Sequence, residues 1–271
     1  LGTIRRVIEK LSPHVLLFAA EGGHDFRRNL YPDYKATRDE TPAELKAQIQ
    51  LAHDAFEAIG WQVLSAPGYE ADDVIATVAS QCQSMELGCT IVSTDKDLQA
   101  LAGSVTIYDP YKDRSIDAAA VQERFGVGPG QLLDLLALAG DKSDNVPGIP
   151  GIGEKTAAAL LAEHGSLEGV LTAAVFRKSH VSKRWTAIYE HREDALLSRR
   201  LVELQKDAPL TEEWMTRPAL HPRSTWYDRL REMGLGMTVK GLSDVLKEPR
   251  TSDTFRQPAI STTGEANHGS E

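Results

Sequence analysis

Acidic residues gather in three short motifs whose types and spacing suit metal chemistry. One motif opens a predicted helix, one directly follows a predicted buried strand, and one lies in a loop rich in Gly and Pro. The seven carboxylates are Glu70, Asp72, Asp73, Asp95, Asp97, Asp141 and Asp144. If these side chains converge, their mutual repulsion requires a compensating positive charge. Because all-oxygen sites suit hard divalent cations, the motifs predict bound Mg²⁺ or Mn²⁺.

Such a site supports phosphodiester hydrolysis. Two ions about 4 Å apart would activate a water molecule and hold both the attacking and the leaving oxygen of a phosphodiester. The chain shows no Cys or His spacing of the kind that binds zinc. The acids therefore favour a magnesium- or manganese-dependent enzyme that acts on phosphodiesters.

Each acidic motif also has a purely structural interpretation. Acids favour a helix N-terminus through the helix dipole, which would account for Glu70 and Asp73. Asp97 would cap a short helix while Asp95 forms a turn, and Asp is common in loops such as the one that holds Asp141. For any one motif both interpretations stay open, and only the convergence of all three separates them.

A basic and aromatic segment lies between residues 21 and 40, where the sequence predicts irregular structure. Its cations and aromatic residues are interleaved: Arg27, Arg28, Tyr31, Tyr34, Lys35 and Arg38. Cations can meet phosphates and aromatic rings can stack on bases, so the segment is typical of a nucleic-acid contact. A solvated loop of mixed charge is the alternative.

A Gly-rich turn opens a predicted helix at Gly148-Ile149-Pro150-Gly151-Ile152-Gly153-Glu154-Lys155-Thr156. Missing side chains let the backbone approach a ligand, and free N–H groups at a helix start favour an anion. The turn lacks the Gly-Lys-Ser/Thr ending of a P-loop. It fits better a helical hairpin that grips a DNA backbone without reading bases. A merely tight connector is the alternative.

Alternating strands and helices precede Asp117 and position the acids. Strands are predicted at 14–20, 61–64, 89–93 and 105–108, and helices at 4–11, 41–58, 70–86 and after Asp97. This alternation predicts an α/β fold with a largely parallel sheet. In such a sheet ligands bind beyond the carboxyl ends of strands, where Asp95 and Asp97 lie.

Helical patterns follow one another after Asp117. They fall at about 117–125, 129–138, 154–164, 166–173 and 193–204. We therefore expect three parts: an α/β nuclease core of PIN-like type, a helical subdomain, and a disordered tail without apolar anchors. Their expected ranges are 1–116, 117–250 and 251–271.

Composition sets limits on the class of protein. The chain has 271 residues, a formal net charge of −9 and 41% hydrophobic residues, which argues against disorder over most of its length. An acidic balance also argues against a histone-like, charge-driven DNA binder. No apolar run approaches the roughly 18–20 residues that span a bilayer, and two cysteines suit a reducing cytoplasm.

Five motifs, in their order along the chain, resemble the bacterial and phage 5′ nucleases. That family includes the 5′→3′ exonuclease domain of DNA polymerase I and stand-alone flap endonucleases. The resemblance covers roughly residues 13–205. The motifs are Phe26-Arg27, Tyr34-Lys35-Ala36-Thr37-Arg38, Glu70-Ala71-Asp72-Asp73, Ser93-Thr94-Asp95-Lys96-Asp97-Leu98, and Gly140 through Lys155.

The resemblance implies the roles of individual residues. The seven acids would bind two or three divalent ions, directly or through water, while Lys35 and Arg38 place and neutralise the scissile phosphate. Tyr34 would stack on a nucleotide, and Arg27 would belong to the same DNA contact. A helix–three-turn–helix element, often with a bound K⁺, would hold duplex DNA through Gly148, Gly151, Gly153, Lys155 and Thr156.

Two departures from the family pattern affect the metal ligands. Members usually begin with a strand that ends in a ligand Asp, whereas here the opening helix comes first, so we expect a fragment that lacks its first strand. Members also usually carry an Asp where this chain has Ala19-Ala20. Glu21 or Asp25 would be the substitutes, and the sequence does not choose between them.

The leading hypothesis is a divalent-metal-dependent 5′→3′ exonuclease and flap endonuclease. It would act on 5′ ends and flaps of DNA independently of base sequence, as a monomer in the bacterial cytoplasm and nucleoid, without a membrane partner. A catalytically degenerate DNA-junction binder of the same fold is the main alternative, because of Ala19-Ala20. A structure-selective RNA nuclease of related fold is the third.

Overall fold

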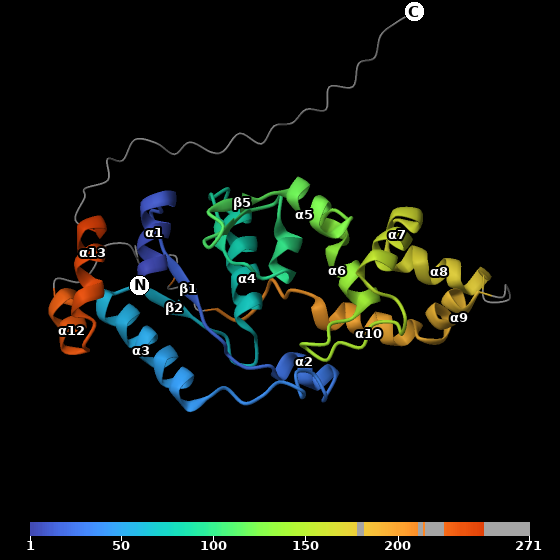
Figure 1. Cartoon of the computed structure of the whole chain (residues 1–271), viewed down its shortest axis with the longest axis horizontal. Coiled ribbons are helices and arrows are strands. Elements are labelled where there is room, and N and C mark those ends of the chain that lie inside the picture. The colour runs from blue at the N-terminus through green and yellow to red at the C-terminus, as the bar shows by residue number, and fades with distance from the viewer. Residues whose placement is uncertain (178–181, 211–213, 215–224, 247–271) are drawn as a thin grey trace, which may run out of the picture.

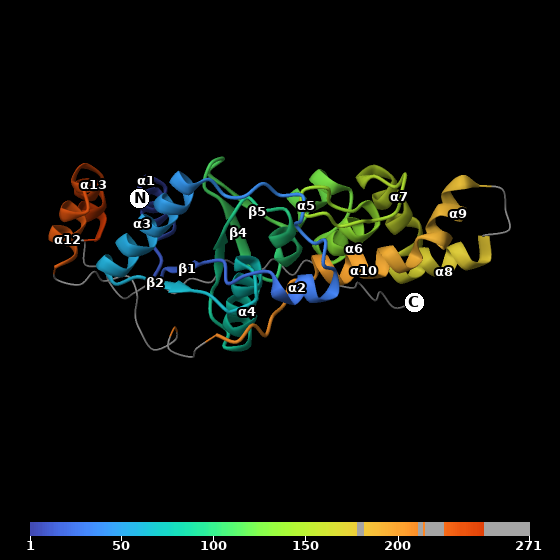
Figure 2. The same ribbon diagram turned by 90° about the horizontal axis from the view of Figure 1, so that it is seen from below.

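The computed structural model describes residues 1–177, 182–210, 214 and 225–246. The molecule is elongated, with its strands near the middle and helices towards both ends (Figure 1). Figure 2 shows the same division from below. The predicted disordered tail, 251–271, lies outside the described residues. Within the described parts of the chain, no helix combines the length and the apolar character that a membrane crossing needs.

The first sheet has two parallel strands, β1 (Leu17–Ala19) and β2 (Gln62–Leu64). Helix α3 (Ala43–Ile59) packs on β2, and its Phe56 ring stacks on Phe18 with centroids 3.9 Å apart. Helix α1 (Gly2–Leu11) packs on α13 (Gly236–Leu246), and α12 (Trp226–Glu232) packs on α3. One apolar cluster at this end contains the buried side chains Ile8, Ala55, Ala58, Ile59, Trp61, Trp226, Leu230 and Leu242.

The second sheet has three strands, β3 (Thr90–Val92), β4 (Thr106–Asp109) and β5 (Arg114–Ile116). Strands β3 and β4 are parallel, whereas β5 returns antiparallel to β4. Strand β5 was not predicted, because its three residues are too few to show a period. The prediction of β3 as a buried strand is wrong: Thr90 and Val92 are exposed, and Ile91 between them is buried.

Helix α4 (Ala71–Ser84) lies between the two sheets and contacts both β1 and the short 3₁₀ helix η1 (Asp97–Leu101). It begins with a capping box in which Glu70 and Asp73 accept hydrogen bonds from each other's backbone N–H groups. This arrangement satisfies two backbone donors at the helix start. Its consequence is that the first acidic motif is held rigidly at the N-terminus of α4.

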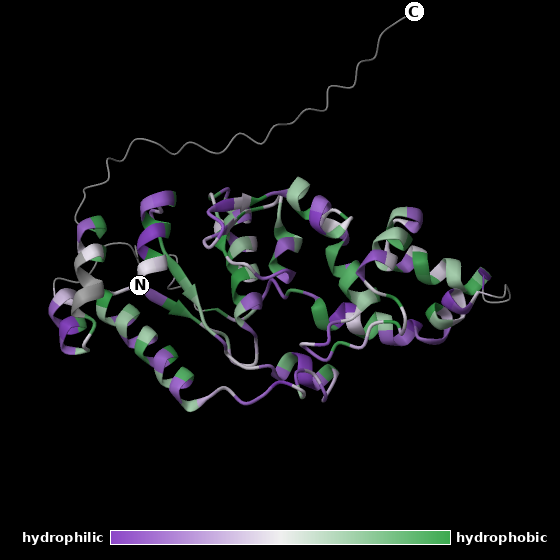
Figure 3. Cartoon of the chain, in the orientation of Figure 1, coloured by the Kyte–Doolittle hydropathy of each residue, from purple (hydrophilic) through white to green (hydrophobic). Residues whose placement is uncertain are grey.

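The helical part follows the predicted pattern closely. The five expected helices are α5 (Ala118–Phe125), α6 (Pro129–Ala139), α7 (Glu154–His164), α8 (Leu167–Arg177) and α10 (Arg192–Val202). Helix α9 (Lys183–Glu190) was not predicted. Helix α6 is surrounded by its neighbours, and Leu132, Leu135 and Leu138 are fully buried. Figure 3 shows the corresponding apolar colouring along α6.

Residues 21–40 contain helix α2 (Asp25–Leu30), so the prediction of irregular structure throughout this segment is wrong. The helix is short and lacks a side-chain cap. Tertiary contacts stabilise it: α2 packs on α10, and Arg27 at its centre is buried in an ion pair. Local sequence signals could not reveal a helix that depends on partners about 50 and 170 residues away.

The expected fold class, an α/β core with a largely parallel sheet followed by a helical subdomain, is confirmed. The parallel pairing is divided between the two sheets, and no strand among the described residues bridges β1 and β3. The carboxyl ends of β3 and β4 lie at one edge of their sheet, since the two strands run parallel. That edge is where the second acidic motif begins.

The loop between α6 and α7 is shaped by close backbone contacts. Asp141 and Val146 exchange two backbone hydrogen bonds of 3.0 and 2.8 Å, which closes the acidic part of the loop. Gly148 has a φ of +60° and lies against the backbone of Gly140, so a side chain has no room there. Its N–H donates to the Ser198 hydroxyl of α10 at 2.9 Å.

We therefore expect Gly148→Ala to destabilise the protein by about 2–4 kcal/mol, through the left-handed backbone and the steric clash. Gly130→Ala is the matched control, because Gly130 lies in α6 with nothing near its missing Cβ and should gain up to about 1 kcal/mol. Urea unfolding of both variants checks this. Equal free energies of unfolding for the two variants would contradict the close backbone packing at Gly148.

Candidate metal centre

A cavity of about 210 Å³ collects acids from all three motifs. Glu70 and Asp72 reach it from the start of α4, and Asp95 and Asp97 reach it from the carboxyl end of β3. Asp144 reaches it from the loop after α6. Five of the seven predicted acids therefore line one cavity, although they come from three separate stretches of chain.

The carboxylates in this cavity repel one another. Burial, together with Asp95 and Asp97, raises the pKa of Asp72 to about 7. Burial and the neighbouring Asp95 likewise raise the pKa of Asp97 to about 7, against the lowering effect of Lys96. Low dielectric and like charge both disfavour the ionised forms. The centre therefore holds negative charge that a cation would stabilise.

The donor atoms fit a hard divalent ion. The Oδ1 atom of Asp97 is buried and has no hydrogen-bond partner among the described residues. A buried acceptor without a donor is costly, and a bound ion removes that cost. Carboxylate oxygens surround it, which is the ligand type that Mg²⁺ and Mn²⁺ prefer. These residues accordingly fit the metal that the acidic motifs predict.

Asp141 lies beside the cavity without lining it. Its Oδ2 pairs with Lys96 Nζ at 2.6 Å, and its Oδ1 accepts hydrogen bonds from the backbone N–H and the hydroxyl of Ser143. These contacts lower the pKa of Asp141 against the effect of its partial burial. Asp141 is close enough to raise the pKa of Asp97. It thus belongs to the electrostatic surroundings of the centre.

Asp73 does not face the cavity, which corrects its prediction as a metal ligand. The side chain is fully buried and forms a two-fold ion pair with Arg27, at 2.6 and 2.9 Å. Its oxygens also accept hydrogen bonds from the backbone N–H groups of Glu70 and Gln205. The structural interpretation, a carboxylate at a helix N-terminus, accounts for this residue.

Arg27 is likewise corrected, from a DNA contact to a buried structural residue. Only 3% of it is exposed, and besides Asp73 it donates to the carbonyl oxygens of Leu201 (2.7 Å) and Glu203 (2.9 Å). Its guanidinium therefore joins α2, α4 and the end of α10. All of these contacts are intramolecular, and the guanidinium also forms part of the cavity wall beside Glu70.

Tyr34 is buried as well, with 3% exposed, so it cannot stack on a nucleotide in this conformation. Its hydroxyl lies 3.1 Å from a carboxylate oxygen of Glu70 and 3.3 Å from one of Asp144. Burial and those acids raise the pKa of Tyr34 strongly. The phenol therefore stays protonated and links two acids that come from different motifs.

Lys35 and Arg38 lie at the cavity, as their predicted role requires. Lys35 Nζ forms an ion pair with Glu70 and lies 3.7 Å from Asp144, and its side chain is 9% exposed. Arg38 pairs with Asp144 while half of its side chain remains exposed. Both cations are thus placed between the acids and the solvent.

The predicted DNA-binding turn divides into a buried and an exposed part. Gly148 is buried, and its N–H donates to the Ser198 hydroxyl, so it offers no donor to a phosphate. The prediction of Gly148 as a DNA contact is therefore wrong. Gly151, Gly153 and Lys155 are exposed at the start of α7, and Thr156 is partly exposed. The exposed residues keep an open helix N-terminus.

Glu21 and His24 were not predicted as a pair with Glu70. His24 Nδ1 lies 2.7 Å from Glu70 and 3.3 Å from Glu21, so three potential metal-binding side chains meet at the rim. Glu21 lines the cavity, whereas Asp25 lies beside Gly68 at the start of α2. Of the two suggested substitutes for the missing Asp, Glu21 is the one at the cavity.

Two family models match the chain in succession. The 5′-3′ exonuclease N-terminal resolvase-like domain matches residues 1–126, and the 5′-3′ exonuclease C-terminal SAM fold matches residues 127–223. The chain belongs to the 5′-3′ exonuclease family. The resemblance inferred from the five motifs is thereby confirmed.

Curated relatives of two kinds are similar to this chain. Flap endonuclease Xni of Aeromonas salmonicida is 38% identical over 212 residues, which is 78% of this chain and 79% of the relative. DNA polymerase I of Rhizobium leguminosarum is 43% identical over 198 residues, which is 73% of this chain and 19% of the polymerase.

The fold is also that of solved family structures. T5 5′-exonuclease with bound zinc superposes with a TM-score of 0.65 at 22% identity, over 90% of this chain and 88% of that one. At this level of identity the similarity concerns the fold. It supports the same arrangement of an α/β core and a helical part in this member of the 5′-3′ exonuclease family.

The repulsion at the centre predicts a pH dependence of stability without divalent ions. The pKa of Asp97 is about 7 in the folded protein and near 3.8 in an ordinary environment, so the folded state binds more protons between these values. Stability is therefore lost as pH rises from about 4 to 7. Asp97→Asn removes this loss and should stabilise the protein by about 1–3 kcal/mol at pH 8, and less at pH 5.

Urea unfolding in a chelating buffer at pH 5 and pH 8 measures this difference. The control is Asp54→Asn, an exposed acid on α3, which should change stability by no more than about 0.5 kcal/mol at either pH. An Asp97→Asn variant that is destabilised equally at both pH values would contradict the repulsion inferred here.

Proposed function

We propose that this chain is a divalent-metal-dependent 5′→3′ exonuclease and flap endonuclease that hydrolyses phosphodiesters at 5′ ends and flaps of DNA. The observation that carries the proposal is the meeting of Glu70, Asp72, Asp95, Asp97 and Asp144 in one cavity. Family membership and the flap endonuclease relatives of similar length support it.

The metal would be held by the acids that line the cavity, with Glu21 in the place of the missing Asp. Bound divalent ions supply an activated water molecule and stabilise the charge on the attacking and leaving oxygens. T5 5′-exonuclease binds divalent ions, and a T5 flap endonuclease variant has been solved with DNA and metal ions. We propose Mg²⁺ or Mn²⁺ for this chain, in two or three sites, because its donors are oxygens.

Lys35 and Arg38 would receive the scissile phosphate. Each already pairs with an acid of the centre. When a phosphate enters the cavity, each cation would exchange its carboxylate partner for the phosphate. The fork of an arginine suits a phosphate in two-fold hydrogen bonding, and the lysine acts as a point charge. Their positive charge would draw the backbone of the DNA towards the acids, which would otherwise repel it.

Duplex DNA would be held at the start of α7. The exposed Gly151, Gly153, Lys155 and Thr156 would present backbone N–H groups and a cation to the phosphates, so binding would not depend on base sequence. We also propose that this turn binds a K⁺ ion and that the protein is a monomer. It would act on DNA in the bacterial cytoplasm and nucleoid.

The main alternative is a degenerate binder of DNA junctions. It is motivated by Ala19-Ala20, where the family pattern has a ligand Asp. Flap binding without cleavage in either Mg²⁺ or Mn²⁺ would favour this alternative. Preference for RNA over DNA flaps of the same sequence would favour an RNA nuclease instead.

Asp97→Asn and Asp144→Asn should each lower Mg²⁺-dependent flap cleavage by at least about 100-fold, because each removes a charged oxygen donor from the centre. DNA affinity should change by less than about threefold, since neither residue belongs to the proposed duplex contact. Single-turnover cleavage and fluorescence anisotropy measure the two effects, with Asp54→Asn as the control. Cleavage at the parental rate by either variant would overturn the assignment of that ligand.

A further inference from the structure

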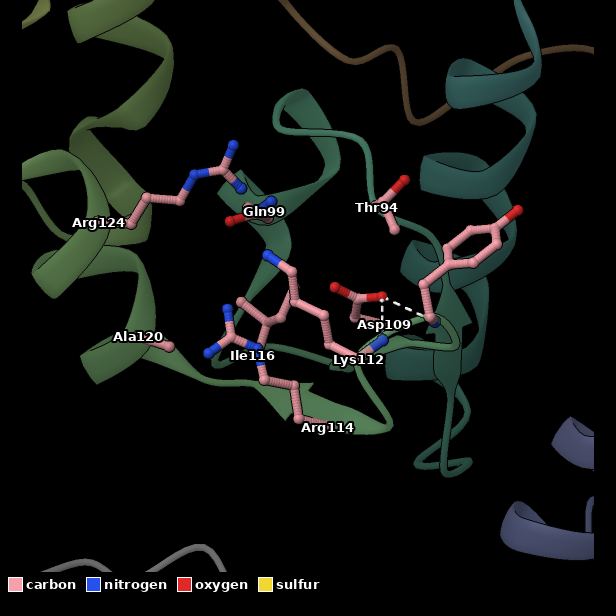
Figure 4. Close-up of a pocket in the computed structure, with 9 residues that line it drawn as sticks. Thr94, Gln99, Asp109, Lys112, Arg114, Ile116, Ala120 and Arg124 are labelled. Carbon is pink, nitrogen blue, oxygen red and sulfur yellow. Dashed lines mark hydrogen bonds between the residues drawn. The ribbon is translucent and has the colours of Figure 1, made fainter.

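A second cavity, of about 190 Å³, lies beside the metal centre on the same sheet edge. Thr94 belongs to its wall, and the next residue, Asp95, belongs to the metal cavity. One short stretch of chain, at Thr94 and Asp95, therefore separates the two cavities. Figure 4 shows the second cavity between η1, the β4–β5 hairpin and α5.

Three cationic side chains from different segments surround this cavity. Lys112 comes from the hairpin turn, Arg114 from the start of β5 and Arg124 from the last turn of α5 (Figure 4). All three residues are exposed. None of them forms an ion pair among the described residues. Arg124 lies over the Phe125 ring, 4.7 Å from its centroid, which leaves its guanidinium charge available to a ligand.

One carboxylate, Asp109, lies in the wall with the three cations. Asp109 is buried, and its Oδ1 accepts hydrogen bonds from the backbone N–H groups of Tyr111 and Lys112, at 2.9 and 3.1 Å. It therefore shapes the hairpin turn that carries Lys112. Three cations against one engaged carboxylate leave the cavity positive, which favours an anionic ligand.

Gln99 connects the second cavity with the metal centre and adds a polar acceptor. It is 1% exposed, and its Nε2 donates to the carbonyl oxygen of Asp95 at 3.3 Å. Its Oε1 is buried and has no hydrogen-bond partner within the part of the chain that the structure describes. A buried acceptor of this kind is satisfied when a ligand brings a hydroxyl or an N–H group. The ligand that fits thus combines an anion with a donor.

We propose that this second cavity binds a nucleotide unit of the DNA substrate, with its phosphate at Lys112, Arg114 and Arg124 and a donor of its sugar or base near Gln99. This inference rests on the proposed function, because it takes DNA as the substrate. Arginine recognises phosphate by paired hydrogen bonds and lysine by charge. A strand held here lies next to the acids that would cut it, so the cavity would anchor the strand beside the scissile phosphate.

The phosphate has two possible sources, an internal phosphodiester of the strand or the terminal monoester of a 5′-phosphorylated end. The experiment therefore uses one flap DNA in two forms, with and without a 5′-phosphate, labelled at a 3′ end. Binding is measured by fluorescence anisotropy in a chelating buffer, where no cleavage occurs, between 50 and 200 mM salt (about the range over which phosphate contacts are lost).

The central variant carries Arg114→Gln and Arg124→Gln together. Its matched control carries Arg114→Lys and Arg124→Lys, which keep the positive charges. Arg229→Gln, an exposed residue of α12 at the far end of the molecule, controls for a general loss of charge. Thermal unfolding of all the variants shows that each is folded.

We expect the glutamine variant to bind DNA about 10-fold more weakly and to lose about one to two units of the salt slope, because each lost phosphate contact lowers the slope by about one. The lysine variant and Arg229→Gln should stay within about threefold of the parent. An equal loss on both DNA forms identifies an internal phosphodiester, and a loss confined to the phosphorylated form identifies the terminal monoester.

Parental affinity and salt slope in a folded glutamine variant would overturn the proposal, as would an equal loss of affinity in Arg229→Gln. If the parent cleaves flap DNA and the glutamine variant binds it normally, the second cavity is not a DNA-binding site, while the proposed function stands. If the parent neither binds nor cleaves flap DNA, the proposed function fails and this inference fails with it.

Discussion

Mutual repulsion among carboxylates in one partly buried cavity is the constraint on which the rest of the structure depends. Acids from the start of α4, the end of β3 and the loop after α6 meet there, and burial together with like charge raises the pKa of Asp72 and Asp97 to about 7. Lys35, Arg38 and Lys96 offset part of this charge by direct ion pairs. The negative charge that remains makes the cavity a site for cations. A bound cation would stabilise the ionised forms of Asp72 and Asp97.

The frame that holds these acids in place is itself built from charged residues of the same motifs. Arg27 binds Asp73 and two carbonyl oxygens of the chain after α10, so one guanidinium fixes α2, the start of α4 and the end of α10 together. Removing one partner of such a buried pair would leave an uncompensated charge. Motif residues thus divide into those that face the cavity and those that hold its walls.

The sequence predicted most of the elements but could not separate these two roles. Helix α7 was predicted at its observed limits because Gly residues flank a clear helical pattern, whereas α2 depends on a distant ion pair and β5 is too short to show a period. Asp72 and Asp73 are neighbours of one type, yet one faces the cavity and the other is buried against Arg27. Only the direction of each side chain around the helix distinguishes them. Glu21 was suggested as a substitute ligand, but its meeting with His24 and Glu70 was not predicted, because Glu70 lies more than 45 residues away along the chain.

The most direct test of the account is calorimetric titration of the metal-free protein with Mn²⁺ at pH 7, in buffers of different ionisation enthalpy. With two acids half protonated at that pH, ion binding should release about one proton, because ligands must be deprotonated. A variant with Asp72→Asn and Asp97→Asn should bind more weakly and release almost none. Binding by the parent with no proton release, or no binding at all, would contradict the central claim that these carboxylates share one repulsive cavity.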